Sequence, residues 1–375
     1  MDRDRPQRQR AVMRNAKATV GAAKTNNFEG LARGDDARFR RDLLGWYDRN
    51  RRDLPWRKTR DPYAIWLSEI MLQQTRVAAV LEHFRIFLER FPNVEALAAA
   101  PEDAVLAAWS GLGYYRRARM LHRCAREIVG RHEGKFPETA AALRELPGIG
   151  RYTAAAIASI AFGEPAAVVD GNVERVLQRV GGRLLGLAQT WKRAQELLSK
   201  SRPGDFNQAM MELGATVCLP RDPRCGECLV REMCATRARE LQAVGSGFAA
   251  LQAACAPRQK KREIWCSLDR RDGHVRLVRR PKDVSLMAGM WELPQWTELP
   301  HQSASAARWR TFRHSITVTD YTVHVLRDWE TKAVNGHEAA VGTRSSRGKW
   351  VAINTIPRLP ITGLTRKILK ADGII

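Results

Sequence analysis

The sequence predicts a two-domain protein in which an all-α domain is followed by a small α+β domain. Between Phe39 and Met233, apolar residues recur at helical spacing in short stretches that are joined mostly by Gly and Pro turns. No clear period-2 pattern interrupts this part, whereas alternation typical of strands begins after Glu263. A chain of 375 residues is long enough for two domains, and a hydrophobic fraction of 44% excludes a wholly disordered protein.

The first domain is expected to contain about ten helices. Asp61 and Pro62 mark one helix start, because Asp is a good N-cap and Pro fits the first helical position. The predicted helices are a segment beginning near Phe39, and then Pro62–Arg76, Val77–Phe91, Val94–Ala99, Pro101–Trp109, Tyr115–Val129, Thr139–Leu146, Thr153–Phe162, Asn172–Val180, Thr190–Leu198 and Asp205–Val217.

The second domain is expected to begin with a hairpin of Ile264–Leu268 and His274–Arg279, joined by a turn at 269–273. Two further strands and a closing helix are predicted at Thr317–Leu326, Lys349–Ile353 and Thr365–Lys370. The resulting boundaries are a disordered basic tail at 1–37, the all-α domain at 38–235, a linker at 236–262 and the α+β domain at 263–375.

The chain is strongly basic, with a net charge of +23 at pH 7. Such an excess favours a polyanionic partner, usually nucleic acid, and heavy use of Arg throughout a proteome is the alternative. Most of the excess lies in residues 1–40 and 236–375, outside the part that carries the motifs below. The longest nearly apolar run, Tyr152–Phe162, is too short to span a bilayer, and the N-terminus lacks the apolar region of a secretory signal. We therefore expect a cytoplasmic protein without a membrane partner.

Four of the seven cysteines follow one another in the spacing C-x6-C-x2-C-x5-C, at Cys218, Cys225, Cys228 and Cys234. Thiols of an intracellular protein stay reduced, so a metal site is favoured over disulfides. The donors suit either a zinc ion or a [4Fe–4S] cluster, and the spacing alone excludes neither. Three arginines are interleaved with the cysteines and would either contact phosphates or offset the negative charge of the thiolates: Arg221, Arg224 and Arg231.

The segment Leu146–Gly150 (LPGIG) is predicted to turn between two helices. Gly148 and Gly150 permit positive φ and a close backbone approach, and the N–H groups at the start of the next helix can hold a phosphate. A plain αα-hairpin is the alternative. Asp170 follows twenty residues after Gly150 and is either an N-cap or a functional carboxylate. The hairpin and the acid at this distance form a specific pattern.

Glu69 lies in an otherwise apolar helix, between Leu67 and Ile70, with Gln73 on the same face. A carboxyl group buried there is expected to have a raised pKa, which suits a general acid near neutral pH. The alternative is that Glu69 lies on an exposed stripe of an amphipathic helix.

Several motifs together resemble the helix-hairpin-helix DNA glycosylases that carry an iron–sulfur cluster, and within them the A/G-specific adenine DNA glycosylases (MutY-type). The motifs are LPWR at Leu54–Arg57, SEIMLQQTRV at Ser68–Val77, GLGYYRRAR at Gly111–Arg119, LPGIGRYTA at Leu146–Ala154, VDGNVERV at Val169–Val176 and the spacing of the four cysteines. The resemblance covers residues 39–235 strongly and 260–370 weakly.

This resemblance implies a monofunctional enzyme of base excision repair that removes adenine mispaired with 8-oxoguanine or guanine in double-stranded DNA. Glu69 would protonate adenine N7, and Asp170 would either stabilise the sugar cation or attack it, with support from Tyr152 and Asn172. The other implied roles are insertion into the duplex by Gln73, Gln74 and Tyr114, an adenine pocket of Leu54, Trp56, Arg57 and Gln208, DNA contact by Gly148 and Gly150, and a [4Fe–4S] cluster held by the four cysteines. The protein is expected to act as a monomer that associates with the nucleoid through DNA.

The chemistry of N-glycoside cleavage agrees with this assignment, since it needs an acid for the leaving group and a carboxylate for the cation. The nearest rival is an endonuclease III-like pyrimidine glycosylase and lyase. That activity needs a Lys nucleophile two residues after the hairpin, where this chain has Tyr152. A non-catalytic iron–sulfur DNA-binding protein is the rival from another class, and the presence of Glu69 and Asp170 argues against it.

The second domain resembles a Nudix-like fold at Leu286–Pro294 but lacks the Glu-rich box that binds metal, so no pyrophosphatase activity is expected. In the family this domain reads 8-oxoguanine through a loop with a Phe-Ser-His string. The stretch Thr311–Val318 begins like that loop and then departs from it. Thr317 or His314 is expected to take its place, and a plain core strand is the alternative.

Overall fold

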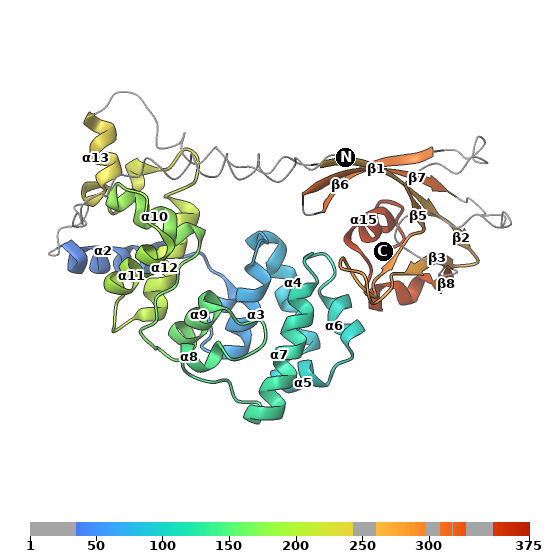
Figure 1. Ribbon diagram of the computed structural model, residues 1–375, viewed down its shortest axis with the longest axis horizontal. Coiled ribbons are helices and arrows are strands. Elements are labelled where there is room, and N and C mark those ends of the chain that lie inside the picture. The colour runs from blue at the N-terminus through green and yellow to red at the C-terminus, as the bar shows by residue number, and fades with distance from the viewer. Residues whose placement is uncertain (1–34, 243–259, 298–307, 317, 328–347) are drawn as a thin grey trace, which may run out of the picture. The chain divides into compact units, whose positions relative to one another are not determined.

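The computed structural model describes residues 35–242, 260–297, 308–316, 318–327 and 348–375. The predicted tail at 1–37 lies almost wholly outside the described residues, and so does Thr317. The chain forms two compact units (Figure 1). The first contains residues 1–51, 169–197 and 208–245, and the second contains 52–168, 198–207 and 246–375. Among the described helices, none has the length and apolar character that a membrane crossing requires.

The helical part of the second unit follows the sequence prediction closely. Asp61 caps its first long helix by accepting hydrogen bonds from the N–H groups of Tyr63 and Ala64, as the Asp-Pro signal predicts. Trp66 and Trp109 are almost fully buried in its core. The elements are η1 (Pro55–Arg57), α3 (Pro62–Leu72), α4 (Val77–Arg90), α5 (Val94–Ala99), α6 (Glu102–Ala108), α7 (Arg116–His132), α8 (Ala140–Leu143) and α9 (Arg151–Ala161).

The C-terminal part of the same unit contains two sheets and a helix. One sheet is mixed, with strand order β5-β1-β7-β6, and β1 runs parallel to β7 but antiparallel to β5. In the other sheet β3 lies between β2 and β4 and also pairs with β8. The bounds are β1 (Lys260–Leu268), β2 (Arg270–Arg271), β3 (His274–Arg279), β4 (Trp291–Glu292), β5 (Gln295–Trp296), β6 (Arg308–Ile316), β7 (Thr319–Arg327), β8 (Lys349–Ala352), η5 (Ile353–Arg358) and α15 (Gly363–Ala371).

The predicted α+β domain differs from the structure in its first hairpin. The segment 264–268 does not form a hairpin with 274–279, because β1 pairs with β5 and β7 while the short β2 pairs with β3. The chain changes sheets at the buried Asp269, whose carboxylate accepts a hydrogen bond from Ser267. The strand β6 was predicted only as the alternative for the stretch Thr311–Val318, because it is an edge strand whose arginines obscure its alternation. Helix α15 packs its Ile368 and Leu369 into the core formed with the strands.

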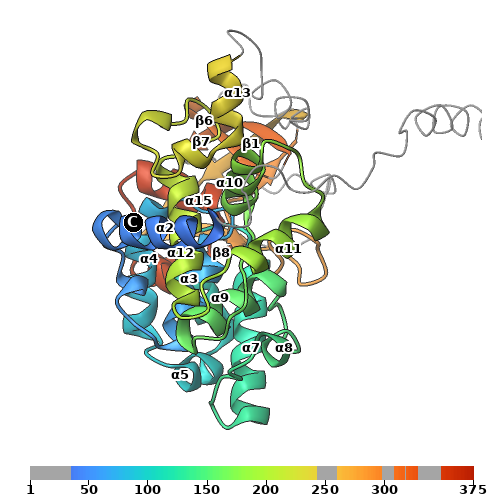
Figure 2. The same cartoon turned by 90° about the vertical axis from the view of Figure 1, so that its left-hand side faces the viewer.

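The first unit is entirely helical in its described part (Figures 1 and 2). Its helix α2 buries Phe39, Leu43 and Tyr47, and Asp36 near its start forms an ion pair with Arg193 at 2.5 Å. The elements are α2 (Asp35–Asn50), α10 (Gly171–Gly181), α11 (Leu187–Leu197), the second half of α12 (Pro203–Thr216), η2 (Cys225–Glu227), η3 (Arg231–Met233) and α13 (Ala235–Gln242). Helix α13 occupies the start of the segment 236–262 that was interpreted as a linker.

Candidate active site

Glu69 is a buried carboxyl group in the middle of α3. Its side chain is only 6% exposed, so the exposed stripe left open by the sequence is excluded. The hydroxyl of Tyr152 donates a hydrogen bond to Glu69 Oε2 at 2.7 Å. The structure therefore brings together two residues that lie 83 positions apart in the chain and that the resemblance assigned to one acid.

The turn Leu146–Gly150 sets the position of Tyr152, because α9 begins at Arg151 immediately after it. Gly148 has φ +79°, and a Cβ atom there would lie 2.8 Å from Met120 Cβ. Gly150 behaves differently: its φ is −85°, and a Cβ atom would meet nothing within 4 Å. Only Gly148 thus uses the positive φ that the sequence allowed for both glycines. Gly150 caps an eleven-residue helix whose N-terminal N–H groups suit a phosphate.

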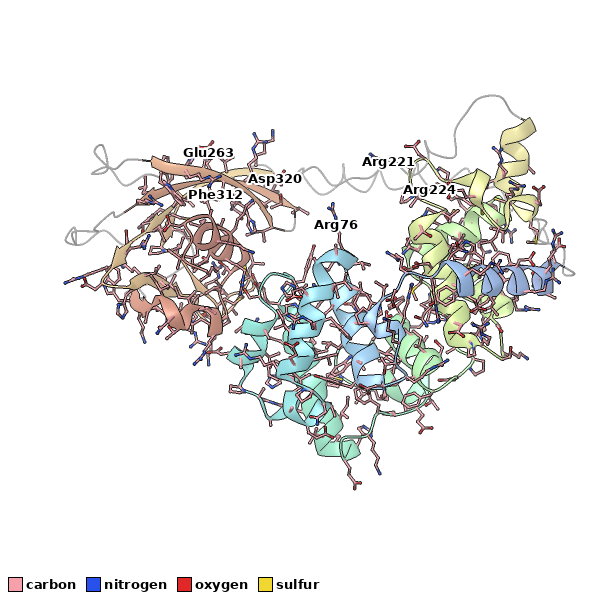
Figure 3. All side chains as sticks on the ribbon, turned by 180° about the vertical axis from the view of Figure 1, so that it is seen from behind. Arg76, Arg221, Arg224, Glu263, Phe312 and Asp320 are labelled. Carbon is pink, nitrogen blue, oxygen red and sulfur yellow. The ribbon has the colours of Figure 1, made fainter. Side chains whose placement is uncertain are left out.

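Two exposed side chains stand on strained backbone near this turn. Helix α3 ends at Leu72 instead of the predicted Arg76, because the carbonyl groups of its last turn accept hydrogen bonds from Arg117. Beyond that end Gln74 has φ +57°, and Tyr114 has φ +46° with half of its surface exposed. Positive φ is uncommon for residues other than glycine and costs energy, so these conformations indicate a specific task. Arg76 projects outward from the turn that follows α3 (Figure 3).

A cavity of about 660 Å³ lies beside these residues. Its walls include the predicted DNA-contacting residues Gln73, Gln74, Tyr114 and Gly148. Residues of the C-terminal part also line it, among them Leu286–Met287 in the loop before β4 and His314–Ile316 on β6. Burial and the nearby Lys367 lower the pKa of His314, so its ring is neutral near pH 7. His314 lies on β6, which makes the plain-strand interpretation of this stretch correct for its backbone, while the side chain still reaches the cavity.

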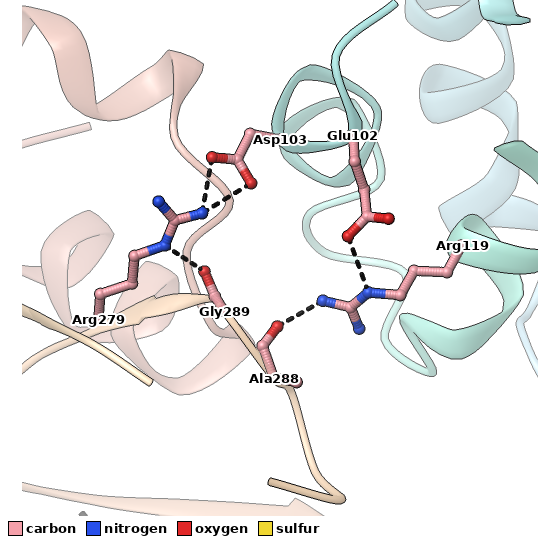
Figure 4. A network of polar contacts seen from close by, with 6 residues as sticks. All are labelled: Glu102, Asp103, Arg119, Arg279, Ala288 and Gly289. Carbon is pink, nitrogen blue, oxygen red and sulfur yellow. Dashed lines mark hydrogen bonds and ion pairs between the residues drawn. The ribbon is translucent and has the colours of Figure 1, made fainter. Parts of the chain in front are cut away.

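Polar contacts hold the C-terminal segment against the helices at this cavity (Figure 4). Arg279 donates two hydrogen bonds to the carboxylate of Asp103, at 2.8 and 2.9 Å, and a third to the carbonyl of Gly289. Arg119 is bonded to Glu102 at 3.1 Å and to the carbonyl of Ala288. Since each arginine fixes a carbonyl group of the 286–289 segment, that side of the cavity is well defined.

The residues predicted to line an adenine pocket are mostly interior. Leu54 and Trp56 are each 6% exposed, and the Trp56 ring packs edge-on against Phe84 at 5.3 Å. Arg57 is half-buried and donates to the carbonyl of Arg52. Gln208 is buried in α12, in the other unit. Contact of these side chains with a base stays a prediction.

Asp170 lies at the N-cap of α10, in the first unit. Its Oδ1 accepts hydrogen bonds from the N–H groups of Asn172 and Val173 at 2.9 and 2.8 Å, and its Oδ2 accepts one from Asn172 Nδ2 at 2.8 Å. The N-cap interpretation is thus confirmed, and the amide of Asn172 fixes the second carboxylate oxygen. Because Glu69 belongs to the second unit, joint action of the two carboxyl groups on one nucleotide stays a prediction.

Arg175 was missed by the sequence reasoning, although it lies within the VDGNVERV motif. Its guanidinium donates to Asn172 Oδ1 at 2.8 Å, to the carbonyl of Gly214 at 2.7 Å and to that of Cys218 at 2.8 Å. It therefore fixes the side chain that holds Asp170. Gly214 permits this arrangement, since a Cβ atom there would lie 2.5 Å from Asn172 Cβ.

The four predicted metal ligands are half-buried cysteines around η2 and η3. Arg179, also missed from the sequence, donates to Cys218 Sγ at 3.4 Å, and its carbonyl accepts from Cys234 Sγ. Burial raises the pKa of Cys228 to about 11, and the nearby thiols of the group add to this shift. Within the described ranges, no three His, Cys, Asp or Glu side chains are placed to hold a single metal ion.

The donor set of this loop nevertheless fits a thiolate-bound group. Its four members are all cysteines, each is partly shielded from water, and the neighbouring thiols add to the burial that raises the pKa of Cys228 and of Cys234. The interleaved Arg221 and Arg224 are exposed and project from the loop (Figure 3). Arg231 donates to Glu232 and to the carbonyl of Gly226. The guanidinium that contacts a thiol belongs instead to Arg179, which donates to Cys218 Sγ.

Comparisons with known proteins agree on one family. Residues 67–200 match the family model described as HhH-GPD superfamily base excision DNA repair protein. The chain is similar to the adenine DNA glycosylase of Rattus norvegicus, with 49% identity over 57% of this chain and 43% of the relative. It is also similar to the adenine DNA glycosylase of Homo sapiens, with 41% identity over 70% of this chain and 58% of the relative. The chain thus spans about half the length of these curated relatives. Among solved structures it resembles a thermostable thymine-DNA glycosylase, with a TM-score of 0.52 and 31% identity over 55% of this chain and 98% of that one.

Proposed function

Because the chain belongs to the HhH-GPD superfamily of base excision DNA repair proteins, we propose that it hydrolyses the N-glycosidic bond of adenine mispaired with 8-oxoguanine or guanine in double-stranded DNA. Relatives named adenine DNA glycosylases support the choice of base. The hydrogen bond between Tyr152 and the buried Glu69 is the observation that carries the proposal.

In the proposed reaction Glu69 gives its carboxyl proton to adenine N7. The bond between C1′ and N9 then breaks, and its electron pair leaves with the base. The carboxylate of Asp170 stabilises the cationic sugar until a water molecule adds to C1′ and releases a proton. Tyr152 holds the Glu69 carboxyl group in place through its hydrogen bond. The same position would carry the Lys that forms a Schiff base in a lyase, and a Tyr cannot form one. The reaction is therefore hydrolysis alone, without strand cleavage.

The target adenine must leave the base stack before it reaches Glu69. Gln74 and Tyr114, exposed on strained backbone at the mouth of the cavity, are the side chains that would fill the gap. The cavity itself would accept the partner of the adenine, with His314 and the 286–289 segment as its C-terminal wall. On this proposal the C-terminal sheets form a Nudix-like lesion-reading domain.

The four cysteines would hold a [4Fe–4S] cluster through their thiolates. When bound, such a group supplies four strong bonds that fix the loop 218–234. Arg221 and Arg224 would then be presented to the DNA backbone on a rigid support. Purified protein is expected to be brown, with equal iron and acid-labile sulfide contents; colourless protein that contains zinc would contradict this part of the proposal.

A base-release assay tests the proposed activity directly. The substrates are three duplexes that differ at one site, carrying adenine opposite 8-oxoguanine, adenine opposite guanine, or thymine glycol. We expect adenine release from the first two and strand cleavage only after added alkali. Cleavage at thymine glycol without alkali would support the lyase rival instead. Equal rates on the two adenine duplexes would contradict a lesion-reading role for the C-terminal sheets.

A further inference from the structure

Arg117 makes an unusual number of hydrogen bonds for one side chain. It lies in the first turn of α7 and points its guanidinium group at two segments of the chain. Nη1 donates to the carbonyl groups of Ile70 (2.7 Å), Met71 (3.0 Å) and Gln73 (2.6 Å), and Nη2 donates to Thr75 Oγ1 (3.1 Å) and to the carbonyl groups of Leu112 (3.2 Å) and Gly113 (3.4 Å). The first two acceptors lie in the last turn of α3, the next two lie just beyond its end, and the last two lie just before Tyr114.

These contacts explain why both segments adopt strained conformations. The last turn of a helix has carbonyl groups without partners in the helix, and a cation placed there is favoured by the helix dipole. Arg117 satisfies them and lets the chain leave α3 at Gln73, so that Gln74 takes φ +57°. The guanidinium carbon also lies 5.6 Å from the ring centroid of Tyr114, which is itself the residue at φ +46°.

The arrangement is expensive for the folded state. Burial lowers the pKa of Arg117 to about 10, which leaves it charged at neutral pH. Its Nε atom is buried and has no hydrogen-bond partner among the described residues. Two residues at positive φ add a strain of about 1–3 kcal/mol each. Arg117 thus stabilises the strained backbone of Gln74 and Tyr114, whose side chains are both exposed at the same cavity. Packing of the core does not require these two conformations.

We propose that Arg117 is a positioning residue that holds Gln74 and Tyr114 in the conformation that keeps the target adenine outside the duplex. The inference rests on the proposed function, because it assigns a task to side chains that insert into DNA. In this role Arg117 acts through Gln74 and Tyr114 and does not itself contact the nucleotide. Lysine cannot replace it, since one ammonium group reaches at most three acceptors and does not present a planar fork.

The test is Arg117→Lys, with Arg123→Lys as the matched control on an exposed residue of the same helix that does not line the cavity. Base extrusion is measured with 2-aminopurine in place of the adenine opposite 8-oxoguanine, in a Glu69→Gln background that leaves the base attached. At saturating protein the fluorescence rise is expected to fall at least tenfold for Arg117→Lys and to stay unchanged for Arg123→Lys. Single-turnover adenine release in the otherwise native protein is expected to fall by a similar factor.

Thr75→Val provides a milder second variant, because it removes one acceptor of Arg117 and leaves the guanidinium in place. We expect the 2-aminopurine fluorescence rise of Thr75→Val to fall by less than that of Arg117→Lys. If Arg117→Lys does not fold, the result for Thr75→Val tests the role of Arg117 instead. A fluorescence rise equal to that of the Glu69→Gln parent, once corrected for the fraction of folded protein, would overturn the role of Arg117. Failure of the native chain to release adenine would instead overturn the proposed function.

Discussion

The phenol of Tyr152 donates a hydrogen bond to Oε2 of Glu69 across 2.7 Å, and so connects the first turn of α9 with the middle of α3. This contact makes the position of the carboxyl group depend on the Leu146–Gly150 turn, since α9 begins directly after that turn. A backbone turn suited to hold a phosphate is thereby coupled to a buried acid suited to protonate a base.

Tyr152→Phe should lower the single-turnover rate of adenine release by about tenfold, because loss of one hydrogen bond to an acid corresponds to roughly 1.4 kcal/mol in the transition state. Tyr63→Phe is the matched control, since the Tyr63 hydroxyl is also buried but donates to the carbonyl of Phe91, away from Glu69. The control is expected to lower the melting temperature without changing the rate. Equal rates for Tyr152→Phe and the native chain would contradict the pairing.

Two substitutions of Asp170 should separate its structural and chemical tasks. Asn is also a good N-cap, so the free energy of unfolding of Asp170→Asn should lie within about 0.5 kcal/mol of the native value. Its rate of adenine release should nevertheless fall by orders of magnitude. Asp170→Ala should lose the cap as well, at a cost of about 1 kcal/mol. Denaturant unfolding and single-turnover assays measure the two effects. Near-native release by Asp170→Asn would show that the residue only caps α10.

The two glycines of the turn should respond differently to the same change. Gly148→Ala forces a side chain into positive φ and within 2.8 Å of Met120, so it should destabilise the turn by about 1–3 kcal/mol and weaken binding to undamaged duplex. Gly150→Ala meets no atom within 4 Å and should leave stability nearly unchanged. Thermal unfolding of both variants provides the comparison, and equal losses would contradict the assigned geometry.

The helices of the second unit were predictable because their signals are local. The Asp61-Pro62 start and the short turns between helices depend on neighbouring residues only. The end of α3 was not predictable in the same way, because it is set by Arg117, 45 residues beyond Leu72 in the sequence. A local pattern extends that helix to Arg76, and only the tertiary contact removes its last four residues.

The candidate site was predicted through its acids, and the arginines that organise it were missed. Glu69 was found because an acid in an apolar stretch is unusual, whereas Arg117 and Arg175 lie among other charged residues. Strand β6 was only the alternative interpretation of its stretch for a related reason, since an edge strand rich in arginine lacks the simple alternation of a half-buried strand. The pairing of β1 with β7 joins segments far apart in the chain, so no local pattern specifies it.

The central claim is that Glu69 supplies the proton that makes adenine a leaving group, and Glu69→Gln tests it most directly. The measurement is single-turnover adenine release from a duplex with adenine opposite 8-oxoguanine, beside the affinity for the same duplex. The exposed Glu145, replaced by Gln, is the matched control for the change of charge. A general acid raises the reaction rate by about 10²–10⁴-fold, so Glu69→Gln should release adenine at least about 100-fold more slowly than the native protein. Its affinity for the duplex should equal that of the native protein. Release at the native rate by Glu69→Gln would contradict the account.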